Sequence, residues 1–268
     1  MRIPIFQIDA FTSKLFGGNP AAVCPLERWL DTPVLQAIAA ENNLAETAFL
    51  VPLAVGRWHL RWFTPTVEVP LCGHATLAAA YAIAHRIDPI RNPIRDLFHF
   101  ETLSGELTVT RDGAHDGDRY TLNFPVRLPE NSMPRPDFAQ ALGAQPQAHF
   151  TGAFEMAVFA TEAEVAALHP DMRALAGIEH FALIATAPGD TVDFVSRFFG
   201  PRAGIDEDPV TGSAHCMLAP YWAERLGKTQ LTARQISLRG GELWCETQGD
   251  RVLISGHGAF YLEGFIEL

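Results

Sequence analysis

Three residues that could take part in chemistry or ligand binding lie directly before an alanine-rich part of the sequence. Cys72, Gly73 and His74 open the stretch LCGHATLAAAYAIAHR, residues 71–86, whose composition predicts a helix with no polar face. The beginning of a helix presents unpaired N–H groups and about half a positive charge. Glycine lets a ligand approach that backbone closely. The stretch therefore suggests a bound carboxylate at the helix start, beside the imidazole of His74.

Two carboxyl groups and a second glycine could complete an acid/base site. Glu46 interrupts the apolar run LAETAFLV, residues 44–51. A carboxyl group in such surroundings loses hydration and suits proton transfer near neutral pH. Asp208 lies shortly before Gly212, which opens a second apolar helix. Plainer interpretations stay open: Glu46 could face solvent from its strand, His74 could be a core histidine, and Asp208 could cap a turn. The glycines could be turn residues only.

The elements that would position these residues occur twice along the chain. Residues 61–65 (RWFTP) are matched by residues 197–201 (RFFGP). Further along, Gly73-His74-Ala75 is matched by Gly212-Ser213-Ala214. Recurrence in the same order predicts two lobes of similar structure. Later phrases recur as well, namely GEL at 105–107 and 241–243, and GDR at 117–119 and 249–251.

The repeat predicts the domain organisation and the fold class. We place the N-terminal lobe at residues 1–125, with the last strand, about 259–268, as a candidate to complete it. The C-terminal lobe is placed at 126–258, after a proline-rich crossing segment that starts at residue 124. Many short strands and one alanine-rich helix per lobe predict an α+β fold. Each lobe would be a mostly antiparallel, barrel-like sheet around a central helix, with the active site in the cleft between the lobes.

One residue conflicts with this pattern. Pro220 lies about two turns into the second apolar helix, where proline removes a hydrogen-bond donor and clashes with the preceding turn. The sequence therefore predicts that this helix is either short or bent.

The composition argues against several classes of function. A net charge of −11 offers no basic surplus for a nucleic-acid partner. Lys14 and Lys228 are the only lysines, and neither is predicted to be buried, which argues against pyridoxal phosphate. No GxGxxG or Walker pattern follows a predicted strand, and no HExxH pattern suggests a catalytic zinc. No apolar run approaches a membrane span or a secretory leader, and no cysteines form a CxxC pair. We therefore expect a cytoplasmic protein without membrane partners.

Several phrases together resemble one known family. DAFTSKLFGGNPAAV, NNLAETAFL, RWFTPTVEVPLCGHATLAAA and GIDEDPVTGSAHC span residues 9–216, and the ending GHGAFYLEGFIEL also fits. With these motifs the chain resembles the PhzF-like family, the phenazine-biosynthesis isomerase group. The resemblance implies a diaminopimelate-epimerase-like fold, a homodimer, and catalysis with no metal and no organic cofactor.

The resemblance also implies roles for particular residues. Glu46 takes the catalytic carboxylate role, with His74 and Asp208 as supporting acid/base residues. On this basis we expect a cofactor-independent isomerase that moves a proton on a small carboxylic acid. The residues implied in substrate binding are Asn19, Gly73, Ala75, Gly212 and Ser213.

The matching helix starts also bear on alternative functions. Related epimerases use a cysteine at each helix mouth, but here Cys72 at the first mouth is matched by Thr211 at the second. A threonine hydroxyl is far too weak an acid to replace a thiol, so two-thiol epimerisation is not expected. Cys72 is interpreted as a small core residue or a residual acid. An amino-acid racemase or epimerase that uses Cys72 with a non-thiol partner, and a non-catalytic binding protein, stay open as alternatives.

Overall fold

The structure is a computed structural model that describes residues 1–87, 96–114 and 117–268. The chain divides into two compact units. Unit 1 comprises Met1–Asn123 and Ser255–Leu268, and unit 2 comprises Phe124–Ile254. The sequence-based boundaries lie at residues 125 and 258. The observed divisions lie between residues 123 and 124 and between residues 254 and 255, and each falls inside a strand.

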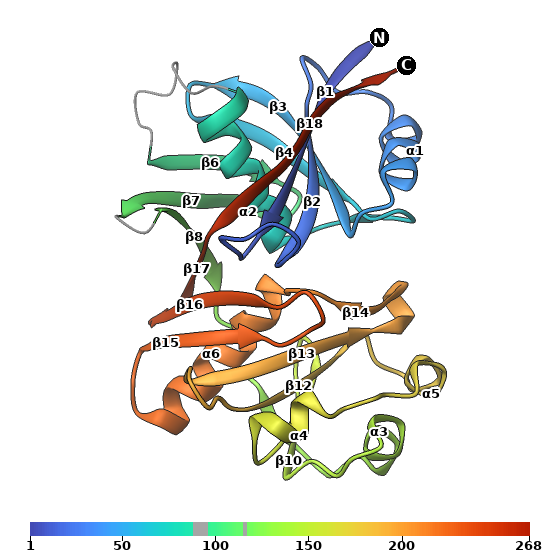
Figure 1. The fold of residues 1–268 in the computed structure, drawn as a ribbon, viewed down its shortest axis with the longest axis vertical. Coiled ribbons are helices and arrows are strands. Elements are labelled where there is room, and N and C mark those ends of the chain that lie inside the picture. Colours follow the sequence, from blue (N-terminus) through green and yellow to red (C-terminus); the bar gives the residue numbers. More distant parts are fainter. Residues whose placement is uncertain (88–95, 115–116) are drawn as a thin grey trace. The chain divides into compact units, whose positions relative to one another are not determined.

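Unit 1 consists of strands arranged around one buried helix (Figure 1). A second helix, α1, lies along the chain between β2 and β3, and the short η1 continues directly from α2. The elements are β1 (Arg2–Ala10), β2 (Asn19–Pro25), α1 (Thr32–Asn42), β3 (Glu46–Ala54), β4 (Arg57–Phe63), β5 (Glu68–Val69), α2 (Gly73–Ala82), η1 (Ile83–Ile87), β6 (Leu97–Thr102), β7 (Gly105–Ala114), β8 (Gly117–Pro125, which ends in unit 2) and β18 (Gly258–Glu267).

The helix α2 forms the centre of unit 1. Every residue of α2 except Tyr81 is buried, and the helix contacts β1, β2 and β3. Its alanines present only methyl groups, so strands can approach it closely on several sides. The prediction of a buried helix with no polar face over this stretch is confirmed.

Unit 2 carries its own strands and helices (Figure 1). A capping box lies at Thr161: its side chain accepts the N–H of Glu164 at 3.2 Å, and the side chain of Glu164 in turn accepts the N–H of Ala160 at 2.9 Å. The elements are β9 (Glu130–Ser132), α3 (Pro136–Leu142), β10 (Ala148–Thr151), β11 (Glu155–Val158), α4 (Glu162–Ala166), α5 (Met172–Gly177), β12 (Leu183–Pro188), β13 (Phe194–Gly200), η2 (Pro201–Ala203), β14 (Ile205–Asp208), α6 (Gly212–Leu226), β15 (Gln230–Gln235), β16 (Gly241–Gln248) and β17 (Arg251–Gly256, which ends in unit 1).

The two units repeat one pattern of strand pairing. In unit 1, β2 pairs parallel with β3, β3 antiparallel with β4, and β4 antiparallel with β5 and parallel with β6, which pairs antiparallel with β7. In unit 2, β11 pairs parallel with β12, and β12 pairs antiparallel with β13. The strand β13 pairs antiparallel with β14 and parallel with β15, which pairs antiparallel with β16. The central helices α2 and α6 occupy equivalent places in the two orders.

The repeat extends to side chains that the matching phrases contain. Arg61 on β4 forms a bidentate ion pair with Glu68 on β5, with both N–O distances at 2.7 Å. Arg197 on β13 does the same with Glu207 on β14, at 2.7 and 2.8 Å. The planar guanidinium fits the two carboxylate oxygens in each case. The pattern RWFTP/RFFGP therefore marks one structural feature that occurs in both units.

Pro220 does not end α6, which continues for six further residues to Leu226. Proline has no N–H to donate to the carbonyl of Cys216, four residues earlier. That carbonyl instead accepts the N–H of Arg127 at 3.0 Å. The expectation of a short second helix is therefore wrong, because another segment of unit 2 supplies the missing donor. Within the described part of the chain, no helix combines the length and hydropathy that a membrane span requires.

Candidate active site

Glu46 is held at the start of a strand and is largely buried. It is the first residue of β3, its partner on β2 is Ala21, and it is 9% exposed. The interpretation of Glu46 as a solvent-facing strand residue is therefore wrong. Its Oε2 atom lies 3.0 Å from Nε2 of His74, which sits in the first turn of α2.

The ring of His74 connects three of the residues singled out in the sequence. Nε2 faces Glu46, and Nδ1 lies 3.2 Å from Nδ2 of Asn19, the first residue of β2. When the ring is neutral, Nδ1 accepts the Asn19 amide N–H and the ring proton sits on Nε2, whereas the charged ring carries a proton on both nitrogens and Nδ1 cannot accept. His74 is thus a buried histidine whose two nitrogens both face polar partners, one of them a carboxylate.

The acidic neighbours favour a charged His74. Burial alone would lower the pKa of this histidine, but Cys72 and Glu46 beside the ring raise it well above its ordinary value. Burial, together with the Glu46 charge, raises the pKa of the Cys72 thiol to about 11. Burial thus disfavours the Cys72 thiolate, and the carboxyl group of Glu46 is the acidic neighbour on the Nε2 side of the ring.

Cys72 contacts the same ring from the other side. Its Sγ lies 3.5 Å from Nδ1 of His74, and the backbone N–H of Ala75 is directed at the sulfur. Ala75 itself is fully buried, so any contact of this residue with a substrate would use its backbone. Cys72 is only 6% exposed, which agrees with a core residue that also touches the candidate acid/base group.

The set Glu46, Cys72 and His74 also has the side-chain types of a metal site. One ligand atom from each residue lies within 4.8 Å of the others. However, the sulfur approaches Nδ1 while the carboxylate approaches Nε2. The lone pairs of the two ring nitrogens diverge, so one ion bound to His74 would reach only one of these neighbours unless the ring turned. The arrangement therefore fits proton transfer better than tetrahedral metal coordination.

The remaining predicted residues belong to unit 2, at the start of α6. Asp208 ends β14 and is 8% exposed, and Gly212 and Ser213 open the helix. The Asp208 carboxylate accepts a hydrogen bond from the hydroxyl of Thr211, the residue that precedes the helix. The Asp208 side chain thus spans the turn before α6, and the Thr211 hydroxyl links it to further buried polar groups.

Two buried residues of this network were missed in the sequence. Gln235 hydrogen-bonds to Asp208 and Thr211, and Nδ1 of His215 donates to the Thr211 carbonyl at 2.9 Å. Burial lowers the pKa of His215 to about 4, with the Thr211 carbonyl opposing that change. His215 directly follows the GSA phrase, which was a usable signal. Gln235 ends an alternating strand, and nothing in its local sequence separates it from an exposed glutamine.

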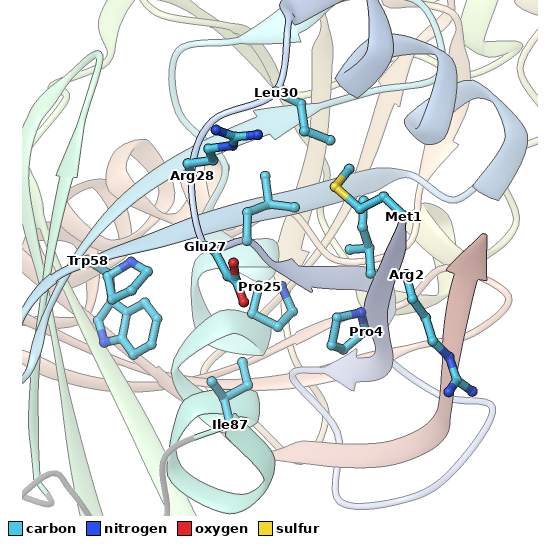
Figure 2. A pocket seen from close by; sticks show the side chains of 12 residues that line it. Met1, Arg2, Pro4, Pro25, Glu27, Arg28, Leu30, Trp58 and Ile87 are labelled. Atoms are coloured by element: carbon cyan, nitrogen blue, oxygen red, sulfur yellow. The ribbon is translucent and has the colours of Figure 1, made fainter. Parts of the chain in front are cut away.

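A pocket of about 750 Å³ lies elsewhere on unit 1 (Figure 2). Its lining includes Met1, Pro25, Glu27 and Trp58. Pro25 is the last residue of β2, whereas Asn19 is the first. The pocket therefore lies at the opposite end of β2 from the Asn19–Glu46–His74 group and contains none of the predicted site residues.

Comparisons with known proteins bear on the family and the fold of the chain. The family described as "Phenazine biosynthesis-like protein" (PhzC-PhzF) matches residues 8–264. An uncharacterized isomerase of Pseudomonas aeruginosa is 49% identical over 269 residues, with 100% of both chains covered. The crystal structure of a PhzF-family protein from Enterococcus faecalis has a TM-score of 0.94 at 43% identity, with 100% of both chains covered.

A more distant structure shares the fold. A protein of Pseudomonas aeruginosa described as a predicted epimerase has a TM-score of 0.77 at 19% identity, covering 98% of this chain and 99% of its own. These likenesses confirm the predicted α+β, epimerase-like fold and the family resemblance. By the match over nearly its whole length, the chain belongs to the PhzC-PhzF family of phenazine biosynthesis-like proteins.

Proposed function

We propose that this isomerase moves a proton on a small carboxylic acid and that Glu46 is its general acid/base. One observation carries the proposal. A largely buried carboxylate lies 3.0 Å from the imidazole of His74, at the start of a helix with buried N–H groups. Such a pair combines a group that can take a proton with a charged neighbour that stabilises the carboxylate.

The proposed step begins at an activated carbon of the substrate. Glu46 takes a proton from that carbon, and the electron pair of the broken C–H bond moves along the conjugated system. The protonated carboxyl group then returns its proton to another carbon of the same molecule. Substrate and product are isomers, so atoms and electrons balance without a second reactant. His74 holds the carboxylate of Glu46 in place between the two transfers.

The substrate carboxylate is proposed to bind at a helix start. Backbone N–H groups in the first turn of α2, from Gly73 onward, have no partners within the helix. The helix α6 begins in the same way at Gly212 and Ser213. We propose Asp208, which precedes α6, as a further acid/base residue of the reaction.

The structure also disfavours the racemase alternative, in which Cys72 acts with a non-thiol partner. Burial keeps the Cys72 thiol neutral, with a pKa of about 11. At the matching position of unit 2, the hydroxyl of Thr211 is already donated to Asp208. A racemase that depends on Cys72 would need a thiolate, which burial disfavours at this position.

Solvent exchange tests the proposal directly. A panel of unsaturated and cyclic carboxylic acids and amino acids is incubated with the protein in deuterium oxide, and deuterium uptake is followed by NMR. With an acid that exchanges, we expect Glu46→Gln to lower the exchange rate about 10²- to 10⁴-fold. Glu41→Gln, which changes an exposed glutamate on α1, is the matched control and should exchange at the wild-type rate.

The same experiment separates the alternatives. Full exchange activity of Glu46→Gln would refute the role of Glu46. Exchange confined to amino acids and abolished by Cys72→Ala would favour the racemase. A wild-type protein that binds an acid of the panel without exchanging any proton would favour a binding protein.

A further inference from the structure

The buried side chain of Gln235 holds the segment that carries Asp208. Gln235 is the last residue of β15, which lies beside β13 and β16 (Figure 1). It is 1% exposed. Burial of an amide side chain costs free energy unless its donors and acceptor are paired. The Gln235 amide pairs with groups of residues 208–211.

The orientation of the Gln235 amide is determined by its two backbone partners. Oε1 accepts the N–H of Thr211 at 2.8 Å, and Nε2 donates to the carbonyl oxygen of Asp208 at 2.7 Å. A backbone N–H can only donate and a carbonyl can only accept. Turning the amide over would therefore break both hydrogen bonds at once.

This orientation then determines which way the Thr211 hydroxyl points. Nε2 of Gln235 also lies 3.2 Å from Oγ1 of Thr211, and since Nε2 can only donate, Oγ1 accepts there. The hydroxyl has a single proton, which is left for Oδ2 of Asp208. One amide thus holds the backbone at both ends of residues 208–211 and directs a donor to the carboxylate.

A second residue after β15 supports the same segment. The hydroxyl of Ser237 donates to the carbonyl of Pro209 at 2.8 Å and accepts the N–H of Gly240 at 3.1 Å. The segment from Asp208 to Thr211 is therefore held along its whole length by the end of β15 and the residues that follow it. Side chains held in this way keep reacting groups in one geometry.

We propose that Gln235 is a positioning residue, which fixes the Asp208 carboxylate and the start of α6 through Thr211. The catalytic part of this inference rests on the proposed role of Asp208 in proton transfer. The positioning itself can be tested without any substrate.

The first test measures the carboxylate directly. Protein labelled with ¹³C at the aspartate side-chain carboxyl is examined by NMR, and Asp208→Asn identifies the Asp208 resonance. We expect Gln235→Leu to move this resonance, while Gln230→Leu, an exposed glutamine on the same strand, leaves it in place. A folded Gln235→Leu protein with an unchanged Asp208 resonance would overturn the inference.

The second test uses a variant that can regain the missing donor. In Gln235→Glu, a protonated carboxyl group can again donate to the Asp208 carbonyl while its other oxygen accepts the Thr211 N–H. We expect exchange activity relative to wild type to drop about 10- to 100-fold at pH 8 and to recover several-fold as the pH falls to 5.5, with kcat affected more than KM. Gln230→Glu should show no such recovery. A flat ratio across this pH range, in protein of wild-type melting temperature, would contradict a positioning role.

The two tests separate the possible failures. If Asp208→Asn turns over like wild type while Gln235→Leu still moves the Asp208 resonance, the catalytic role of Asp208 fails and the positioning stands. If Gln235→Leu does not fold, Gln235→Glu supplies both readouts at low pH, and there an Asp208 resonance that does not respond to pH overturns the inference.

Discussion

His215, a fully buried histidine of unit 2, is expected to make the protein sensitive to acid. His215 has no exposed surface, donates from Nδ1 to the Thr211 carbonyl, and lies beside the ring of Phe194 at a centroid distance of 5.8 Å. Burial lowers its pKa from 6.5 to about 4. Since the folded protein resists protonation of this ring, the unfolded chain binds more protons between these two values. Stability from His215 is therefore present above pH 6.5 and is lost as the pH falls toward 4.

The size of the effect follows from the two pKa values. They differ by about 2.5, and a difference of one pKa unit corresponds to about 1.4 kcal/mol, so the full loss is about 3.5 kcal/mol. At pH 5, where the unfolded ring is almost fully protonated and the folded ring is still neutral, the loss is already about 2 kcal/mol. This is a large part of the net stability of a typical domain.

Denaturant unfolding of wild type and His215→Met at pH 7, 6 and 5 measures this loss. Methionine has a similar volume and no titrating group. The substitution therefore changes the unfolding free energy by a constant amount and removes only the pH dependence that His215 contributes. We expect the difference in unfolding free energy between the two proteins to change by about 2 kcal/mol from pH 7 to pH 5. His169→Gln, at an exposed position, is the control and should follow wild type. A difference that stays constant within about 0.5 kcal/mol would refute the reasoning.

Three further predictions follow from the structure. Cys72→Ala should keep exchange activity within a few-fold of wild type, since the neutral thiol supplies no base; a loss of about 100-fold or more would point to a catalytic thiol. Gly18→Ala should destabilise the protein by about 2 kcal/mol or more and lower activity, because Gly18 has a φ of +59° and a Cβ there would overlap the Ala10 carbonyl, next to Asn19; thermal unfolding and the exchange assay would show otherwise if both stayed at wild-type values. Arg197→Met should cost about 1–3 kcal/mol more than Arg61→Met, because Arg197 also donates to the carbonyls of Leu168 and Val165. Equal unfolding free energies of the last two variants would contradict this.

The linear sequence determined the duplicated architecture and singled out the candidate acid/base residues. The matched phrases at 61–65 and 197–201 correspond to equivalent strands that carry equivalent ion pairs. The alanine-rich stretch after Cys72 predicted a buried helix because side chains without polar groups need no solvent-facing side. These features are local or repeated, so they can be read without knowing which distant residues meet.

Tertiary structure decided everything that depends on partners far apart in the chain. Pro220 predicted a short or bent helix, but α6 continues to Leu226 and the N–H of Arg127 pairs the carbonyl of Cys216. Gln235 gains its importance only because β15 ends beside Asp208. In unit 1, β2 and β3 bring Asn19 and Glu46 to the two nitrogens of His74. The free energy of a polar group depends on whether it is buried and on what pairs with it, and both are properties of the folded chain.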